Sequence, residues 1–188
     1  YHMLAAFPHP NILRMHGMWT ATHNEVKYLY IAMEACCTTL WRYIGVDNPP
    51  IRFRFALQGR QAHVLLGILR AVGFLHCLGV THGDCSLSYV VITQTGEPRL
   101  ADFGTVTAHS FITREKLCVS YIRPPEATLG SYRKGLAVDS WAVGLIILAL
   151  WTGTVPTNEW PRPDSSDQRA REYALRAAVR LLPPISEE

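Results

Sequence analysis

His82-Gly83-Asp84 and Asp102-Phe103-Gly104 are the two short strings that decide the fold of this chain, and their aspartates lie 18 residues apart. A third string, Pro124-Pro125-Glu126, follows, with its glutamate 24 residues beyond Asp102. Each string alone is a weak signal. Their order and spacing together are specific, because an accidental match would have to satisfy three strings and two intervals at once.

The composition is that of a folded globular domain. Of the 188 residues, 48% are hydrophobic and 18% are charged, which suits one domain with a core and is too apolar for a disordered chain. The net charge of +3 is too small to indicate a nucleic-acid or membrane partner. The longest apolar run, Ala142 to Trp151, is about half as long as a bilayer requires, so we expect a core helix there.

The five cysteines have neither disulfide nor metal-site spacing, since there is no C-x-x-C pair and Cys36 is adjacent to Cys37. We therefore expect free thiols in a reducing compartment. No signal peptide is visible. The expected location is intracellular, in the cytoplasm or the nucleus.

The hydrophobic pattern predicts an α+β fold that is mostly α-helical. In chain order the predicted elements are strands at 12–19 and 26–33, a short helix at 38–45, a long helix at 53–78, strands at 90–92 and 99–101, a helix at 138–153 that is buried on all sides, and a polar helix at 167–182. Turns at 20–25 and 95–98 separate the paired strands, and Gly79 ends the long helix. Residues 105–126 have no clear period and are expected to form a loop.

The three strings resemble the catalytic loop, the magnesium-binding Asp-Phe-Gly and the Ala-Pro-Glu of the eukaryotic protein kinases. The order of the predicted elements is similar to that family from about Phe7 to Gly153. The resemblance implies a protein-kinase-like fold that is truncated at both ends. Residues 1–35 would be a remnant of the N-terminal lobe with the hinge, and residues 36–188 would be an incomplete C-terminal lobe.

The resemblance also implies roles in phosphoryl transfer, which depends on positioned phosphates, metal ions and a carboxylate that accepts the hydroxyl proton. Asp84 occupies the place of that proton acceptor, and Asp102 occupies the place of a magnesium ligand. After Met33, the backbone of Glu34 and Cys36 occupies the hinge position that binds adenine. ATP and Mg²⁺ are the implied cofactors of the full-length parent. The alternative for Asp84 is an Asp that caps a turn. For Asp102 it is a plain β-turn, and for Glu34 it is a surface Glu at a strand end.

Structural roles are implied for five further residues: His82, Phe103, Gly104, Glu126 and Asp139. Phe103 would pack inward, and Gly104 would allow the backbone turn. Asp139 resembles a buried carboxylate at the head of the central helix that accepts N–H bonds from the catalytic loop. An ordinary N-cap Asp is the alternative there.

The chain departs from the family pattern at four positions: Gly83, Ser86, Tyr89 and Val119. Tyr89 stands where the second metal ligand, an Asn, belongs, and a phenol is a poor magnesium ligand. Ser86 replaces a Lys that would stabilise charge at the γ-phosphate. Gly83 replaces the Arg that binds a phosphorylated activation loop, and Val119 replaces a Thr that contacts the catalytic Asp.

The upper part of the family's nucleotide site has no counterpart in this sequence, which contains neither a Gly-rich loop nor a Val-Ala-x-Lys strand. The three lysines, Lys27, Lys116 and Lys134, do not lie where the family's ATP-binding Lys would be. We therefore expect the 188-residue piece alone to be inactive.

These observations favour a protein kinase-like domain of the serine/threonine type. It would bind ATP in the full-length parent, with weak or lost phosphotransfer, as a pseudokinase scaffold. A divergent active kinase that transfers the γ-phosphate to protein hydroxyls is the first alternative. A small-molecule phosphotransferase, which also uses His-Gly-Asp but lacks the Pro-Pro-Glu, is the second. The expected partner is a protein substrate or binding protein, with no nucleic acid and no membrane.

Overall fold

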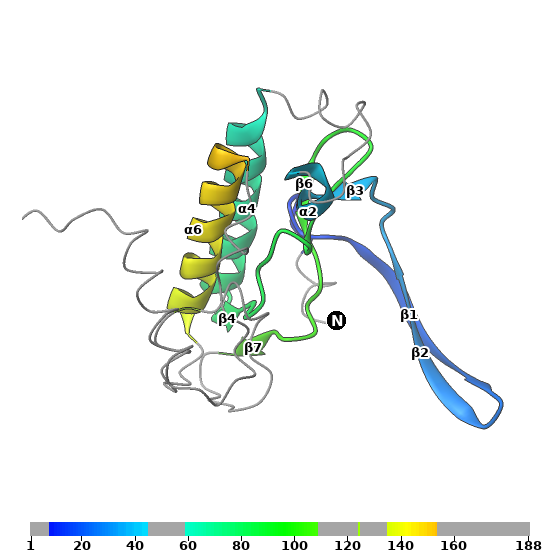
Figure 1. Cartoon of the computed structure of the whole chain (residues 1–188). Helices are drawn as coiled ribbons and strands as arrows, with labels where there is room; N and C mark the ends of the chain where they lie inside the picture. The colour runs from blue at the N-terminus through cyan, green and yellow to red at the C-terminus, as the bar shows by residue number, and fades with distance from the viewer. Residues whose placement is uncertain (1–7, 45–58, 109–123, 125–134, 154–188) are drawn as a thin grey trace, which may run out of the picture.

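Two long helices, α4 (Gln61–Cys77) and α6 (Leu136–Thr152), lie side by side in the computed structural model (Figure 1), which describes residues 8–44, 59–108, 124 and 135–153. In α4 the buried residues Val64, Ile68, Val72 and Leu75 recur every three or four positions, as on one face of a helix. Gly79, with φ of 72°, donates its N–H to the His76 carbonyl at 3.0 Å. The predicted helix end is therefore confirmed.

The helix begins later than predicted. Gly59 has φ of 79° and lies outside the helix, as does Arg60, the residue before its first turn. Glycine adopts this left-handed backbone at no steric cost. A single helix from residue 53 is therefore wrong, because Gly59 interrupts it; residues 53–58 lie outside the described part.

α6 is the apolar helix predicted at 138–153, and one side of it is buried, including Ala142, Val143 and Ile146. Trp151 at its C-terminal end is 89% exposed. The prediction of burial on all sides is therefore wrong in the structure, where α6 packs on α4 along one face. Within the described residues, no helix combines the length and apolarity needed to cross a bilayer.

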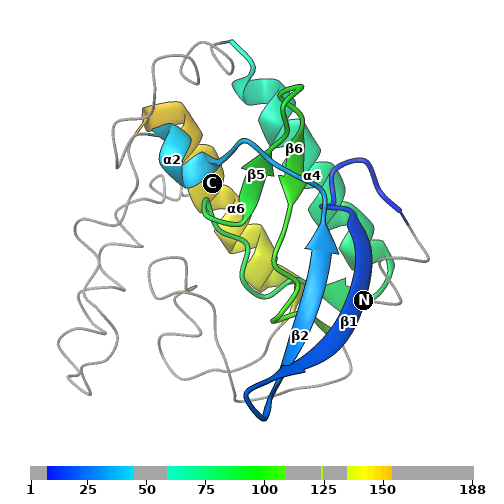
Figure 2. The ribbon, with the colours of Figure 1, turned by 90° about the vertical axis from the view of Figure 1, so that its right-hand side faces the viewer.

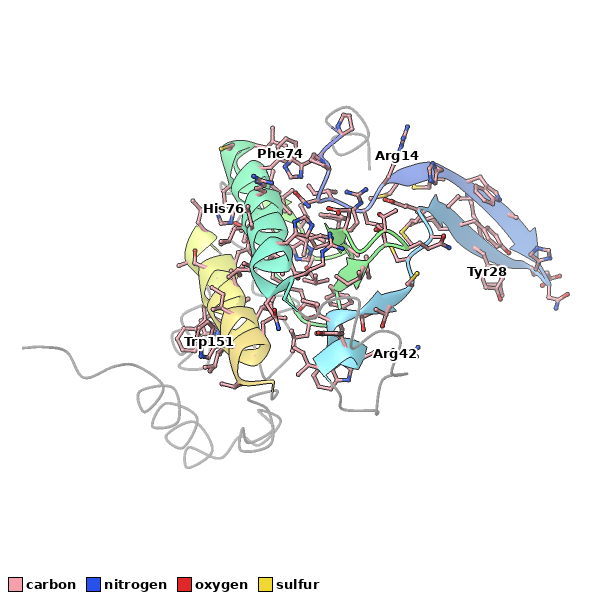
Figure 3. The ribbon with its side chains drawn as sticks, turned by 90° about the horizontal axis from the view of Figure 1, so that it is seen from above. Arg14, Tyr28, Arg42, Phe74, His76 and Trp151 are labelled. Atoms are coloured by element: carbon pink, nitrogen blue, oxygen red, sulfur yellow. The ribbon has the colours of Figure 1, made fainter. Side chains whose placement is uncertain are left out.

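A hairpin of β1 (Met15–His23) and β2 (Val26–Met33) projects from the rest of the molecule (Figure 1). Its turn is only two residues long, because Asn24 and Glu25 both have positive φ, at 49° and 63°, as a tight type I′ hairpin requires. β2 has the predicted bounds, while β1 starts and ends later than predicted. Side chains extend outward from both strands (Figure 3), and Tyr28 is 47% exposed.

A three-stranded sheet lies beside α4, with β5 (Val90–Ile92) between β3 (Thr38–Thr39) and β6 (Pro98–Leu100) (Figure 2). β5 has the predicted bounds, and β6 begins one residue earlier than predicted. The short helix α2 (Leu40–Ile44) follows β3 directly. The close approach of α4 and β6 depends on Gly67, because a Cβ there would overlap the Pro98 ring.

A second short pair joins β4 (Val80–Thr81) to β7 (Thr107–Ala108), and β7 lies within the stretch 105–126 that was predicted to be a loop. Residues 105–126 are therefore not wholly irregular, since β7 pairs with the strand before His82. The helix predicted at 167–182 lies outside the described residues. The same holds for Val119 and Glu126.

Candidate functional site

Asp139 forms the base of the loop that carries His82, Gly83 and Asp84. Its side chain is fully buried in the first turn of α6. Oδ2 accepts the His82 N–H at 2.9 Å, and Oδ1 accepts the Gly83 N–H at 2.9 Å. Gly135 precedes the first turn of α6 as its N-cap, so the alternative of an N-cap Asp is wrong. The bonds are those that the resemblance led us to expect.

Two more groups contact this carboxylate. His76, from the last turn of α4, places Nε2 2.9 Å from Asp139 Oδ2, and the Cys85 thiol lies 4.0 Å from Oδ1. A buried carboxylate is tolerated when it is hydrogen-bonded on both oxygens. Asp139 thus joins α4, α6 and the loop. Sequence reasoning missed His76, because a His near a helix end gives no sign of a partner 63 positions away.

The His82 ring is buried and its orientation is set by two backbone groups. Nδ1 accepts the Asp84 N–H at 3.3 Å, so Nε2 carries the ring proton and donates to the Ala101 carbonyl at 3.0 Å. Burial lowers the pKa of His82, against opposing effects led by the Asp139 carboxylate. The Thr105 hydroxyl donates to the His82 carbonyl at 2.9 Å. The ring thus joins the 82–84 loop to the segment that leads into Asp102.

Asp102, rather than Gly104, has the left-handed backbone in this segment. Its φ is 59°, an uncommon value for a residue with a side chain, although Asp tolerates it better than most. Gly104 lies in the turn closed by the Val106 N–H and the Phe103 carbonyl, as expected, although its φ is not left-handed. A Cβ on Gly104 would lie 3.2 Å from Asp102 Oδ1, which accepts the Gly104 N–H. Gly104 therefore leaves room for the Asp102 carboxylate.

Phe103 packs inward, as expected. It is partly buried against the core, and its ring lies edge-on to the His82 ring with centroids 5.3 Å apart. Asp102, directly before it, is exposed. The alternation places one side chain in the core and the carboxylate at the surface.

The substituted positions in the loop are largely removed from solvent. Ser86 is fully buried, and its hydroxyl has no hydrogen-bond partner among the described residues. Tyr89 is half-buried; its N–H donates to the Ser86 carbonyl at 3.0 Å, and its carbonyl accepts the Ala101 N–H at 2.8 Å. Asp84 is 9% exposed. Gly83 has φ of 81°, a conformation that is strained for any residue with a side chain.

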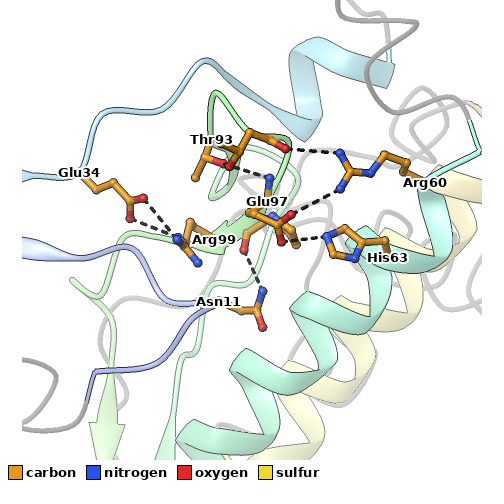
Figure 4. Close-up of polar contacts among 9 residues, drawn as sticks. Asn11, Glu34, Arg60, His63, Thr93, Glu97 and Arg99 are labelled. Atoms are coloured by element: carbon orange, nitrogen blue, oxygen red, sulfur yellow. Dashed lines mark hydrogen bonds and ion pairs between the residues drawn. The ribbon is translucent and has the colours of Figure 1, made fainter.

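Glu34, directly after β2, makes three contacts, of which Figure 4 shows the one with Arg99. Its carboxylate pairs with Arg99, at 3.1 Å from Nε and 3.4 Å from Nη2, and its N–H donates to the Arg14 carbonyl at 2.8 Å. The Cys36 thiol lies 3.9 Å from the Glu34 carbonyl. Burial and the Glu34 charge raise the pKa of that thiol. Glu34 thus follows the end of β2 with a partly exposed side chain, and its link to Arg99 was not predicted.

The described part of the chain contains no group of three or more His, Cys, Asp or Glu side chains that could hold a metal ion. A site made wholly of protein ligands is thus not found there. Mg²⁺ often takes one or two carboxylates and completes its shell with water and substrate phosphates. The exposed Asp102 carboxylate fits that kind of site.

Comparison with known proteins places these features in a family. A family model described as protein kinase domain matches residues 1–186. Cyclin-dependent kinase 10 of Rattus norvegicus is 28% identical over 151 residues, covering 79% of this chain and 40% of that protein. The CTD kinase subunit alpha of Schizosaccharomyces pombe is 32% identical over 138 residues, covering 69% of this chain and 23% of that protein. The chain thus spans less than half the length of these relatives.

A solved structure of the yeast RNA Pol II CTD kinase CTDK-1 complex superposes on this chain with a TM-score of 0.70. The match covers 94% of this chain and 53% of the other, at 20% sequence identity. At that identity the similarity concerns the fold alone. The protein-kinase-like fold is therefore confirmed.

Proposed function

Because this chain belongs to the protein kinase family, whose domain model covers residues 1–186, we propose that it is a serine/threonine-type kinase domain that binds ATP but transfers phosphate weakly or not at all. This activity belongs to the longer parent protein. In this proposal residues 1–35 form the remaining part of the N-terminal lobe with the hinge. Residues 36–188 form the C-terminal lobe.

The observation that carries the proposal is that a buried, uncharged side chain, Ser86, stands where the family carries a Lys. In a kinase the corresponding Lys supplies positive charge to the γ-phosphate, where charge develops during transfer. Here the position carries a hydroxyl that is fully buried. Asp84 remains as the proton acceptor, next to a position that no longer supplies a cation.

Metal binding should also be weaker than in an ordinary kinase, because one of the two ligand positions is changed. Asp102 supports one Mg²⁺ together with the nucleotide's phosphate oxygens, since its carboxylate is exposed. The second ligand position carries Tyr89, whose phenol is a weak ligand at neutral pH. When bound, Mg²⁺ neutralises phosphate charge, so its partial loss weakens both nucleotide binding and transfer.

Adenine recognition rests on the backbone of the hinge. The Glu34 N–H is already engaged by the Arg14 carbonyl, so its own carbonyl is the group offered to adenine. The Cys36 N–H is the donor that completes the pair. The Arg99 ion pair positions Glu34 through its side chain, which supports a preformed hinge.

A divergent active kinase is the second candidate, favoured by the left-handed backbone of Asp102. Backbone strain of this kind costs roughly 1–3 kcal/mol and clusters at functional sites. The family match supports either protein kinase candidate over a small-molecule phosphotransferase. A protein substrate or binding partner goes with both candidates. None of the four described cysteines forms a disulfide, which supports an intracellular location.

The test is calorimetric titration of the full-length parent with ATP, with and without Mg²⁺. We expect weak binding that Mg²⁺ strengthens only slightly. Asp102→Asn should remove that increment, whereas the matched control Glu25→Gln, at the hairpin tip, should leave it intact. Tyr89→Asn with Ser86→Lys should enlarge it, with thermal unfolding used to verify that the double variant folds. Turnover by the unmodified parent at about 1 per second or faster, as in ordinary kinases, would establish the second candidate instead.

A further inference from the structure

A cavity of about 590 Å³ lies beside the hinge, where the chain enters β1. Its walls come from residues 8–10 and 12–16, from Glu34 and from Arg99 on β6. This volume is within the roughly 300–1,000 Å³ of ligand pockets in proteins. Asp84, Asp102 and Cys36 do not line it. The cavity is therefore separate from the proposed metal and catalytic groups.

Positive charge predominates in this cavity. Its charged lining residues are Arg14, Arg99 and Glu34, two cations against one acid, and His9 and His16 add imidazole rings. The Glu34 carboxylate is already paired with Arg99. The charge of Arg14 is therefore not compensated within the lining.

The Arg14 side chain is exposed, and no hydrogen bond or ion pair engages its guanidinium within the described ranges. Figure 3 shows it on the same side of the molecule as Phe74, opposite Arg42. A guanidinium presents five N–H donors in a planar fork that matches a carboxylate. Arg14 is thus a donor prepared for an anionic ligand.

A second donor is provided by His9. Its ring stacks on Phe74 with centroids 4.7 Å apart, and its Nδ1 accepts the Asn11 N–H at 3.1 Å. The neutral ring therefore carries its proton on Nε2. Burial lowers the pKa of His9, and the charges of Arg70 and Arg99 lower it further. Positive potential from both α4 and β6 thus reaches this ring.

We propose that this cavity binds an acidic peptide segment of a protein partner, with a Glu or Asp side chain placed on Arg14. A compact anion such as phosphate requires donors that converge on one point. Of the two arginines that line the cavity, Arg99 is paired with Glu34, so Arg14 alone offers an uncompensated guanidinium, which suits one carboxylate rather than a phosphate surrounded by several donors. The exposed rings of Pro8 and Pro10 add apolar surface for the intervening residues. Nothing in this inference depends on nucleotide binding.

The experiment titrates the full chain into a fluorescent peptide of alternating Glu and Leu, at low ionic strength where exposed charges are least screened. Arg14→Gln should weaken binding about fivefold, the upper range for one exposed charge pair. The matched control Arg42→Gln, on the opposite side, should leave affinity unchanged. In NMR spectra the ring signals of His9 and His16 should move on peptide addition, and that of His63 should not.

Two further ligands distinguish an acidic peptide from a small anion as the occupant of the cavity. The same peptide with Gln in place of Glu should not bind, and inorganic pyrophosphate should not displace the acidic peptide through Arg14. Equal losses in the Arg14 and Arg42 variants would reveal a diffuse charge effect and overturn the proposal. Pyrophosphate binding that depends on Arg14, with no binding of the acidic peptide, would assign the cavity to a small anion and overturn it as well.

Discussion

The underside of the 82–89 loop and the side that we propose to face the nucleotide differ in what holds them. On the underside, the fully buried Asp139 accepts two buried backbone N–H groups and contacts the partly buried His76. On the other side, Asp102 is exposed and its carboxylate accepts only the nearby Gly104 N–H among the bonds described. The underside stabilises the fold, whereas the other side depends on groups that a ligand would supply. We therefore propose that a substitution such as Tyr89 alters metal binding without changing the loop backbone that Asp139 holds.

The substitution with the largest expected effect on stability is the removal of Asp139, and it tests this comparison directly. We expect Asp139→Ala to reduce the free energy of unfolding by roughly 2–4 kcal/mol, since the buried N–H groups of His82 and Gly83 lose their acceptor. Asp102→Asn, on the opposite side, should change it by no more than about 0.5 kcal/mol. Urea unfolding of both variants measures the difference, and equal midpoints would show that the two sides are equivalent.

The next effect concerns His76. Replacing it by Ala should cost about 1–2 kcal/mol, because Asp139 Oδ2 loses one of its two donors in the core. His63→Ala, on the same helix, removes an exposed contact with Glu97 and should cost no more than about 0.5 kcal/mol. If thermal unfolding gave the two variants the same stability, the buried contact would have no special weight.

Two glycines should respond with opposite signs. Gly83→Ala places a side chain at φ of 81° and should destabilise the protein by roughly 1–2 kcal/mol. Gly144→Ala lies inside α6 with open space around its Cβ and should stabilise it by about 0.5–1 kcal/mol. Chemical denaturation of the pair checks this, and a stabilising Gly83→Ala would contradict the strained loop.

The smallest effect is the pH dependence from His82. Above about pH 6.5 the ring is neutral in both states, so it adds no pH dependence. Below that value the unfolded chain takes up a proton that the buried ring resists, because its folded pKa is lowered. Stability should fall as the pH falls from 6.5 through the folded pKa, by at most about 1.4 kcal/mol per unit. His82→Gln should flatten the slope between pH 7 and 5; an unchanged slope would exclude His82.

The parts that the sequence predicted well are those governed by nearby residues. β2 and β5 have the predicted bounds, and Gly79 ends α4 as expected. Alternation, helical period and glycine are local signals, because backbone sterics act over a few positions. The strings that begin at His82 and Asp102 could be recognised from the sequence for the same reason, since each is a short segment and the interval between them is fixed. The roles of Asp84 and Asp102 follow from those strings and stay predictions.

The tertiary structure alone decided the pairings between distant residues. Asp139 with His76, and Glu34 with Arg99, join positions 63 and 65 residues apart, and neither pair has a period or motif to mark it. The left-handed backbone of Asp102 and the edge-on contact of Phe103 with His82 were likewise not marked by any local signal. Such outcomes depend on which side chains face one another once the core has formed. The sequence thus determined the family and the positions of the loops, and packing determined which groups hold them.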